Sequence, residues 1–526
     1  MRFSLAALSV AVVTSLSAQT QSQVKGVYTP GQMTPHQQLT RDIYKQLIET
    51  KTGVSTGNIT DAAVAMAQRF KEAGIPESDI FVGGPLPHKH NVVARIRGRA
   101  GSTRKPLILL AHLDVVEALK ADWSPEFDPF VFTEKDGYWY GRGTADDKAM
   151  AAIFVANVYR LKQEGFQPDR DIIIALTADE EGGGSNGVSW LLQNHKELVD
   201  GGLVINEGGG GTLRDGKYLF ISVQAAEKTV TNYTLRVTNR GGHSSVPRPD
   251  NAITSLADAL SKVGRYNFPV KFNEVNKDFF LKTAAVETPE MGRAMKAVVA
   301  NPKDAAALKI VTADLRYNSM LRTTCVATGL SGGHAQNALP QLAEANINCR
   351  KFPDESAEQV RAELVRVIGD TSVEVIAQAR SGAAPPASPE LTLIPELMDP
   401  VTKITKEMFG NIPVIPAMST GATDSRFFRS QGVPAFGVSG LFSDPTVDAR
   451  AHGRDERMRI QSFFEGQEFL YRLTKALASN QQSAINNQHF QYSPDRPLPC
   501  HCLRVLSRND RLTEPFLERD RSALGE

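Results

Sequence analysis

The hydrophobic pattern of the chain predicts an α/β fold in which short buried strands alternate with amphipathic helices. Three continuous apolar runs are typical of strands buried on both faces of a parallel sheet, at residues 107–111, 171–177 and 202–206. Apolar residues recur at helical spacing in five longer segments, at residues 37–51, 60–73, 148–162, 398–409 and 460–478. We therefore expect a mixed, mostly parallel sheet flanked by helices.

The pattern changes between residues 222 and 382, where strands and helices follow one another in the order βαββαβ. The predicted strands here are residues 229–238, 323–330, 343–350 and 372–379, and the predicted helices are residues 251–263 and 356–368. Because this order is that of a ferredoxin-like unit, we interpret 222–382 as a domain inserted between two parts of the first domain, 19–221 and 383–479. A largely helical stretch at about 273–319 interrupts the inserted domain, and its role cannot be read from the pattern.

The three buried strands each end in histidine or carboxylate side chains. His112 and Asp114 follow the first strand, Glu180 and Glu181 follow the second, and Glu207 follows the third. Ligands of open α/β sheets collect beyond the carboxyl ends of the strands. Clustered carboxylates raise one another's pKa or recruit a cation. A strand-end histidine or a solvated acid explains each occurrence alone, but three occurrences at one edge indicate a bound cation.

Two further acids, Asp146 and Asp147, follow a glycine-containing turn and precede the helix predicted at 148–162. Adjacent acids at the start of a helix can simply cap it. Their neighbours along the chain, a strand-end histidine before them and an acid pair after them, favour a metal-binding role instead.

Seven motifs, found in the family's order along residues 37–478, make the chain resemble the M20 family of metallopeptidases, the group of carboxypeptidase G2, aminoacylase-1 and succinyl-diaminopimelate desuccinylase. The motifs are His112-Leu113-Asp114, Gly141-Arg142-Gly143-Thr144-Ala145-Asp146-Asp147-Lys148, Asp179-Glu180-Glu181-Gly182, Asn206-Glu207-Gly208, Gly242-His243-Ser244-Ser245, Asn337-Ala338-Leu339-Pro340 with Arg350, and Ala451-His452-Gly453. Each motif is weak alone, but the ordered set is specific. The insertion at about 273–319 and the tail at 480–526 depart from the compact members of the family.

The resemblance implies two zinc ions per subunit, about 3.5 Å apart as in other two-metal hydrolases. By motif position, Asp146 would bridge the ions, and the other ligands would be His112 and Glu207 for one ion and Glu181 and His452 for the second. Two imidazoles and three carboxylates suit zinc, and cobalt or manganese could replace it in vitro. The resemblance also implies a cis peptide bond between Asp146 and Asp147.

The resemblance further implies three catalytic roles. Glu180 would be the general base that takes a proton from a metal-activated water and passes it to the leaving nitrogen. Asp114 would orient His112 through its carboxylate. His243 would stabilise the developing oxyanion in the active site of the neighbouring subunit, although an ordinary turn histidine is the alternative interpretation.

Three residues match the family's positions for binding the free carboxylate of the substrate. Arg350 would bind it bidentately, Asn337 would add a donor, and Gly421 would offer its backbone N–H. The alternatives are structural, with Arg350 as a surface strand residue and Asn337 as a turn former. Because the inserted domain of the family commonly mediates dimerisation, we expect a homodimer.

Composition and the N-terminus limit where the protein works. With 526 residues the chain is too long for one core, and its net charge of +1 gives no indication of binding to nucleic acid or an anionic membrane. Residues 1–18 resemble a cleaved signal peptide, so we expect an exported protein with no membrane attachment after cleavage. Residues 480–526 lack apolar periodicity, and we expect them to be disordered. Only 4 cysteines are present, and a disulfide between Cys325 and Cys349 stays open.

Together these features predict an exported zinc hydrolase that cleaves a peptide or an N-acyl amino acid next to a free carboxylate. A carboxypeptidase- or dipeptidase-like activity is the preferred hypothesis, and an aminoacylase is the alternative within the same class. Desuccinylation, a cytosolic reaction, does not fit a chain with a signal peptide. A catalytically inactive relative that serves as a binding protein is the alternative of another class, and the intact ligand set argues against it.

Overall fold

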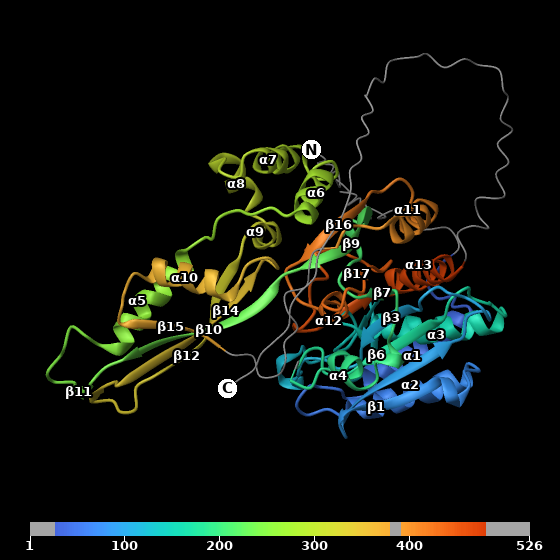
Figure 1. Ribbon diagram of the computed structural model, residues 1–526, viewed down its shortest axis with the longest axis horizontal. Helices are drawn as coiled ribbons and strands as arrows, with labels where there is room; N and C mark the ends of the chain where they lie inside the picture. The colour runs from blue at the N-terminus through green and yellow to red at the C-terminus, as the bar shows by residue number, and fades with distance from the viewer. Residues whose placement is uncertain (1–26, 183, 379–390, 480–526) are drawn as a thin grey trace, which may run out of the picture. The chain divides into compact units, whose positions relative to one another are not determined.

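The computed structural model describes residues 27–182, 184–378 and 391–479 (Figure 1). The predicted signal peptide at 1–18, the proline- and alanine-rich link at 383–389 and the tail at 480–526 lie outside the described residues. No helix in the described ranges is long and apolar enough to cross a membrane.

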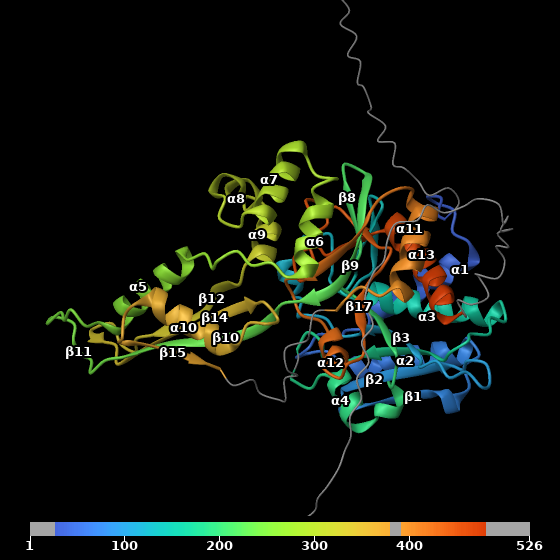
Figure 2. The same cartoon turned by 45° about the horizontal axis from the view of Figure 1, so that its top comes forward.

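The largest sheet of the described chain is mixed and has ten strands, and helices surround it (Figures 1 and 2). Its spatial order is β1 (Ile80–Leu86), β2 (Lys89–Ile96), β6 (Ile172–Thr177), β3 (Leu107–His112), β7 (Leu203–Asn206), β17 (Ala435–Gly437), β9 (Lys217–Glu227), β8 (Gly211–Arg214) and β18 (Phe442–Ser443), with β16 (Val414–Ser419) paired to β9. The central strands β6, β3, β7 and β17 are parallel, whereas β1 and β2 pair in the antiparallel sense. Strand β9 is antiparallel to β17 and β8 but parallel to β16. The predicted mixed, mostly parallel centre is confirmed.

Helices cover both faces of this sheet, because its central strands are apolar on both sides. Leu109 of β3 faces a core that includes helices α1, α2, α3, α11 and α13, whereas its neighbour Leu110 faces a second core with α4 and α12. The helices are α1 (Pro35–Glu49), α2 (Ile59–Glu72), α3 (Lys148–Gln163), α4 (Gly187–Asn194), α11 (Pro395–Phe409), α12 (Ser425–Arg429) and α13 (Ile460–Ala478). The two-sided burial explains why the strands have continuous apolar runs instead of alternating ones.

The inserted stretch contains a separate antiparallel sheet of four strands. It comprises β10 (Thr229–Thr238), α5 (Ala252–Arg265), β12 (Thr324–Gly332), β14 (Leu342–Lys351), α10 (Ala357–Ile368) and β15 (Val373–Ala377), and the strands lie in the order β12-β14-β10-β15. Both helices pack on one face, with Leu256 and Leu364 in the core they share with the sheet. The βαββαβ order is therefore that of a ferredoxin-like unit. A short pair, β11 (Gly242–His243) with β13 (Ala338–Leu339), lies beyond the end of the four-stranded sheet.

The chain passes from the large sheet to the small one at Lys228. Strand β9 pairs with β16 as far as Glu227, and β10 begins pairing with β14 at Thr229. The predicted start of the inserted domain at residue 222 therefore falls within β9. The ammonium group of Lys228 is buried and donates hydrogen bonds to the carbonyl oxygens of Ser319 and Arg322.

Four helices fill the interruption predicted at about 273–319. They are α6 (Glu274–Thr283), α7 (Pro289–Ala300), α8 (Ala305–Val311) and α9 (Leu315–Leu321). Their core is continuous with Phe220 of β9 and Ile415 of β16, so these helices pack against the large sheet as well as against one another (Figure 2). Arg214 and Glu287 add a bidentate ion pair between the large sheet and the inserted helices.

Cys325 and Cys349 form a disulfide bond between neighbouring strands of the small sheet. The two residues are direct partners in the antiparallel register of β12 and β14. The pairing left open by the sequence is therefore present in the structure.

The core of the inserted helices allows a stability test. Phe280 of α6 is completely buried, so Phe280→Ala should lower the free energy of unfolding by about 3–5 kcal/mol in urea denaturation. The neighbouring Leu281 is 41% exposed, and Leu281→Ala should change the same quantity by less than about 1 kcal/mol. Equal effects of the two substitutions would contradict the burial of Phe280 in this core.

Candidate active site

The parallel strands β3, β6 and β7 bring their acidic and histidine residues to one edge of the large sheet. β3 lies between the other two strands, in parallel register with both. His112 ends β3, Glu180 and Glu181 follow β6, and Glu207 follows β7. The parallel register therefore brings these segments to a single edge of the sheet, as the sequence analysis predicted.

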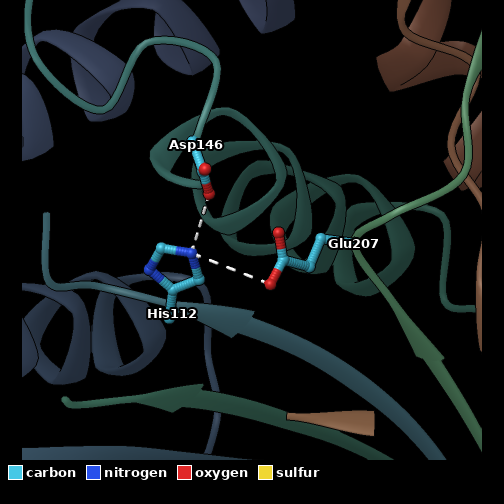
Figure 3. Close-up of side chains that lie close together, drawn as sticks. All are labelled: His112, Asp146 and Glu207. Atoms are coloured by element: carbon cyan, nitrogen blue, oxygen red, sulfur yellow. Dashed lines mark hydrogen bonds and ion pairs between the residues drawn. The ribbon is translucent and has the colours of Figure 1, made fainter. Parts of the chain in front are cut away.

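His112, Asp146 and Glu207 form a first group of converging ligand atoms (Figure 3). Nε2 of His112 lies 3.0 Å from Oδ1 of Asp146 and 3.8 Å from Oε1 of Glu207. The three side chains come from the end of β3, the turn before α3 and the end of β7, and they point toward a common centre.

Asp146, Glu181 and His452 form a second group. Nε2 of His452 lies 2.7 Å from Oε1 of Glu181 and 3.1 Å from Oδ2 of Asp146. Asp146 therefore presents one carboxylate oxygen to each group, which is the arrangement of a ligand that bridges two ions. The grouping coincides with the two ligand sets inferred from the motifs.

The residues present fit a pair of divalent cations. Within each group the ligand atoms all lie within 4.8 Å of one another, and the donors are imidazole nitrogens and carboxylate oxygens. Burial and like charges raise the pKa of Glu207 well above its ordinary value, so its ionised form needs a nearby positive charge. Burial would lower the pKa of His112, but its hydrogen bond with Asp146 and the charge of Glu207 raise it well above the usual range. In the absence of metal, the imidazoles of His112 and His452 thus supply the positive charge that bound divalent cations would otherwise supply.

The resemblance implied that the carboxylate of Asp114 orients His112, but the backbone carbonyl of Asp114 does so. Nδ1 of His112 donates to the backbone carbonyl of Asp114 at 2.9 Å, whereas the nearest carboxylate oxygen is 3.8 Å away. The carboxylate accepts hydrogen bonds from the backbone N–H groups of Glu180 and Glu181 at 3.1 and 3.0 Å. The side chain of Asp114 therefore positions the general-base candidate and a metal ligand, while its main chain sets the tautomer of His112.

Glu180 lies in a strongly acidic environment. Burial raises its pKa well above the ordinary value, and the charges of Asp424, Glu181 and Asp114 raise it further. Asp424 is itself buried, and its Oδ1 accepts a hydrogen bond from Nδ2 of Asn186 at 2.6 Å. A carboxylate with a raised pKa is a stronger proton acceptor than an ordinary carboxylate.

The turn that carries Asp146 is held by Glu456, which sequence analysis did not single out. Glu456 is completely buried, and its carboxylate accepts from the guanidinium of Arg142 at 2.6 Å and from the backbone N–H groups of Gly143 and Ala145. A further contact comes from the N–H of Asp146 at 3.3 Å. Glu456 lies four residues after His452. It therefore connects the segment of His452 to the turn that carries Asp146. In the sequence, Glu456 stands in the charged run Asp455-Glu456-Arg457, a pattern typical of an exposed surface segment.

The peptide bond between Asp146 and Asp147 is cis, as the resemblance implied. The next residue, Lys148, is completely buried, and its ammonium donates to the carbonyl oxygens of Leu47 and Thr50 at 2.8 and 3.0 Å. Burial lowers the pKa of Lys148 to about 7. These contacts fix the start of α3 directly behind the bridging carboxylate.

Of the three predicted carboxylate-binding residues, Arg350 lies close enough to Glu180 for their charges to interact. Arg350 is half-buried on β14, and burial and the charge of Arg426 lower its pKa, whereas the charge of Glu180 raises it. Gly421 follows β16, and its N–H donates to Oγ of Ser419 at 3.1 Å. The backbone donor of Gly421 thus already has a partner, which a substrate would have to replace.

The structure places His243 and Asn337 elsewhere in the chain, together with each other. Both residues are exposed, on or beside the short pair β11 and β13, where the N–H of Ser244 donates to the carbonyl of Asn337 at 3.0 Å. In the register of β10 and β14, Arg350 pairs with Val230 near one end of β14, and Leu342 pairs with Thr238 at the other end, next to this short pair. Eight residues of strand span about 27 Å, so Arg350 and His243 of one chain cannot contact the same substrate group.

Comparison with known protein families matches residues 108–476 to Peptidase family M20/M25/M40. The chain belongs to this family. The match covers every metal-ligand candidate, and the M20 family comprises metal-dependent hydrolases, so the protein is an M20 hydrolase with candidate metal-binding groups.

Relatives of this M20 chain include both acyl-amino acid hydrolases and a carboxypeptidase-like protein. The human N-fatty-acyl-amino acid synthase/hydrolase PM20D1 is 27% identical over 421 residues, covering 78% of this chain and 82% of the relative. The probable carboxypeptidase S-like 2 of Dictyostelium discoideum is 29% identical, with 78% and 84% covered. Human aminoacylase-1 is 28% identical, with 72% and 81% covered.

Solved structures of M20 enzymes have the same fold as this chain. The metallo-carboxypeptidase Sso-CP2 from Sulfolobus solfataricus matches with a TM-score of 0.61 at 18% identity, covering 84% of this chain and 99% of that one. Human carnosine dipeptidase 1 matches with a TM-score of 0.62 at 16% identity, covering 84% and 96%. At these identities the likeness supports the fold.

Metal uptake by the apo-protein should release protons. Hydrogen bonds with Asp146 and Glu181 raise the pKa of His452 to about 10, so its imidazole is protonated at pH 7 without metal. Because a metal ligand must be neutral imidazole, zinc binding should displace this proton, and affinity should fall as the pH falls. Titration of zinc into apo-protein, in buffers of different ionisation enthalpy, measures the protons released.

The raised pKa of His452 also makes the stability of the folded apo-protein depend on pH. The ion pairs of His452 stabilise the folded apo-protein fully below about pH 6.5, the usual histidine value, and this contribution is lost as the pH rises through about 10. His452→Gln should remove both the proton release assigned to His452 and this part of the pH dependence. An unchanged proton count in that variant would contradict His452 as a ligand.

Proposed function

We propose that this M20 chain is a zinc-dependent hydrolase of amide bonds that lie next to a free C-terminal carboxylate. The observation that supports it most is the carboxylate of Asp146, which offers one oxygen to each of two ligand groups beside Glu180. Two-metal hydrolases use this arrangement to activate water. A catalytically inactive binding protein would have no need of both complete ligand groups and a carboxyl group with a raised pKa.

Zinc ions bound by these groups would lower the pKa of a water molecule toward about 7. Glu180 accepts the proton of the attacking water, whose oxygen bonds to the amide carbonyl carbon. As the C–N bond breaks, Glu180 returns that proton to the leaving nitrogen, so the products are a carboxylic acid and an amine. Glu180 is supported in this role by Asp114, which holds its backbone N–H, and by the burial that raises its pKa.

Arg350 binds the free carboxylate of the substrate. Its guanidinium pairs with no carboxylate among the described residues and donates one long hydrogen bond, from Nε to Asn348 at 3.3 Å. A planar guanidinium with free donors binds a carboxylate bidentately. The N–H of Gly421 would add a donor after Ser419 turns away.

Peptides and N-acyl amino acids are the two substrate classes that meet this requirement. The carboxypeptidase S-like relative and the fold of Sso-CP2 support a peptidase, which is our first hypothesis. The relatives PM20D1 and aminoacylase-1 support the alternative, hydrolysis of N-acyl amino acids.

The active site is completed by a second copy of the chain, which brings His243 and Asn337. Ser245 donates its N–H to Nδ1 of His243 at 3.1 Å, so Nε2 carries the proton and can stabilise an oxyanion. Strand β12 is an edge of the small sheet, and its Val326 and Leu330 are 57% and 72% exposed. An exposed apolar edge strand is suited to an interface between copies, which would form a homodimer through the inserted domain.

Export of the protein is supported by the signal-like residues 1–18 and by the disulfide between Cys325 and Cys349. Disulfides persist mainly in oxidising compartments outside the cytosol.

Hydrolysis of a mixed substrate panel tests the reaction. The panel holds dipeptides, longer peptides and N-acetyl amino acids, each with a C-terminally amidated control, and the zinc-loaded protein should cleave only the free-carboxylate members. Glu180→Gln should keep its zinc by metal analysis and lose about 100- to 10,000-fold in kcat. Wild-type activity in that variant would contradict the role of Glu180, and an absence of turnover in the zinc-loaded wild type would favour a binding protein.

Mixing two inactive variants tests the shared site. His243→Ala lacks the oxyanion donor and Glu180→Gln lacks the base, but a heterodimer contains one site with both groups intact. After exchange of subunits, the mixture should recover about a quarter of the wild-type activity, because half of the dimers are mixed and each has one complete site. Light scattering gives the mass in parallel. A fully active monomer, or a mixture that stays inactive although heterodimers form, would contradict the shared site.

A further inference from the structure

Lys228 lies at the crossover between the two sheets of the described chain. Strand β9 ends at Glu227 and β10 begins at Thr229. The side chain of Lys228 is completely buried, and its Nζ donates hydrogen bonds to the carbonyl oxygens of Ser319 and Arg322 at the end of α9. Helix α9 lies beside this crossover in both views (Figures 1 and 2). The two bonds thus join the crossover to residues 91 and 94 positions further along the chain.

On the side of the large sheet, the crossover is tied to the segment 419–424. The main-chain N–H of Lys228 donates to the carbonyl of the first residue of this segment at 2.9 Å. The carboxylate of Glu227 accepts hydrogen bonds from the N–H and the hydroxyl of Thr423 at 3.0 and 2.9 Å. Asp424 ends the segment, and its charge raises the pKa of the general-base candidate. The crossover is therefore fixed to the edge of the catalytic site.

On the side of the inserted sheet, the crossover flanks Arg350. In the antiparallel register, Arg350 of β14 pairs with Val230 of β10 and with Thr324 of β12. Val230 comes two residues after Lys228, and Thr324 comes two residues after Arg322, whose carbonyl Lys228 binds. The side chain of Lys228 thus ties together, where they begin, the two strands on either side of Arg350.

The tie does not depend on the charge of Lys228. Burial lowers the pKa of Lys228 to about 7, against the opposing effect of Glu355. The charge of Arg350 lowers it further, so these two side chains are close enough to interact. A neutral amine still has two N–H donors for the two carbonyl acceptors. Both hydrogen bonds can therefore be made in either protonation state.

The helices of the 273–319 insertion give this tie a firm base. Helices α6 to α9 share a core with Phe220 of β9 and Ile415 of β16, which are both strands of the large sheet. A densely packed core resists deformation, so the carbonyls at the end of α9 are held in place relative to the large sheet. The insertion therefore braces the inserted sheet through Lys228.

We propose that Lys228 is a positioning residue, which fixes Arg350 relative to the candidate metal ligands by tying its sheet to the inserted helices. The inference rests on the proposed function, because it takes Arg350 as the residue that binds the substrate carboxylate. Glu180 is close enough to act on the charge of Arg350. A substrate is held at two points, its carboxylate and its scissile carbonyl, so a fixed spacing between them favours binding.

Lys228→Met tests the inference, because methionine is similarly long and has no N–H donor. With a free-carboxylate substrate that the zinc-loaded wild type cleaves, KM should rise at least about tenfold. The value of kcat should change by less than about threefold, and metal analysis should find the zinc content unchanged.

Lys262→Met is the matched control. Lys262 of α5 also donates a hydrogen bond to the last carbonyl of a helix, that of Ile368 in α10. Both of these helices pack on the inserted sheet, so their bond does not link it to the large one. Lys262→Met should therefore keep the wild-type kinetic constants.

A double-mutant cycle with Arg350→Lys separates positioning from a purely structural role. This substitution keeps the positive charge and removes the planar fork that has to be oriented. In the Arg350→Lys background, Lys228→Met should lower kcat/KM by less than about twofold, whereas a general loosening of the protein would act equally in both backgrounds. Lys228→Gln, which keeps N–H donors on a shorter side chain, goes through the same cycle and should raise KM less than Lys228→Met.

Each outcome bears on the inference or on the proposed function. A rise in KM that disappears in the Arg350→Lys background supports the inference. An unchanged KM, a loss of zinc, an equal effect in both backgrounds or an equal rise in Lys262→Met overturns it and leaves the proposed amide hydrolysis in place. Failure of both Lys228 variants to fold, judged by circular dichroism, would assign Lys228 to stability and also overturn it. An absence of turnover by the zinc-loaded wild type overturns the proposed function together with the inference.

Discussion

The site depends on one constraint, which is that several carboxylates must remain close together where water is largely excluded. Asp146, Glu181 and Glu207 converge with Glu180 at the edge of the large sheet. Like charges in such a place are unfavourable unless cations neutralise them. At Asp146 this repulsion is reduced directly, because each of its two carboxylate oxygens faces one histidine. Divalent cations at the two groups would relieve it further, so folding and metal binding are energetically coupled.

The convergence is maintained by groups that do not face the substrate. Glu456 holds the turn of Asp146 through backbone donors, and the carboxylate of Asp114 holds the backbone of the Glu180 segment. These acids are fully buried, so their hydrogen bonds must be made within the protein. Removing either carboxylate would leave several backbone donors without partners, at about 1–3 kcal/mol for each. The ligand geometry is therefore built largely from main-chain hydrogen bonds to buried acids.

The sequence sufficed to predict which strands meet and which residues end them, because apolar runs and strand-end acids are local signals. It could not separate the roles of neighbouring acids. Asp179 stands beside Glu180, yet its carboxylate pairs with Lys89 at 2.5 Å, a contact between residues far apart in the chain. Asp424 and Glu456 were missed for the same reason, since burial by distant segments gives them their roles. The orientation of His112 by a carbonyl oxygen, and the extension of β9 to Glu227, likewise depend on tertiary contacts.

The ligand groups draw on both ends of the described chain, and this has a consequence for biosynthesis. His452 lies 271 residues after its partner Glu181, with the whole inserted domain between them. Contacts at such separation form only after the intervening chain has been made. During synthesis the first group can assemble before the second, so a nascent chain holds at most half of the centre. Acquisition of the second ion would therefore mark the completion of the fold, and a chain truncated before residue 452 would remain without a complete two-metal centre.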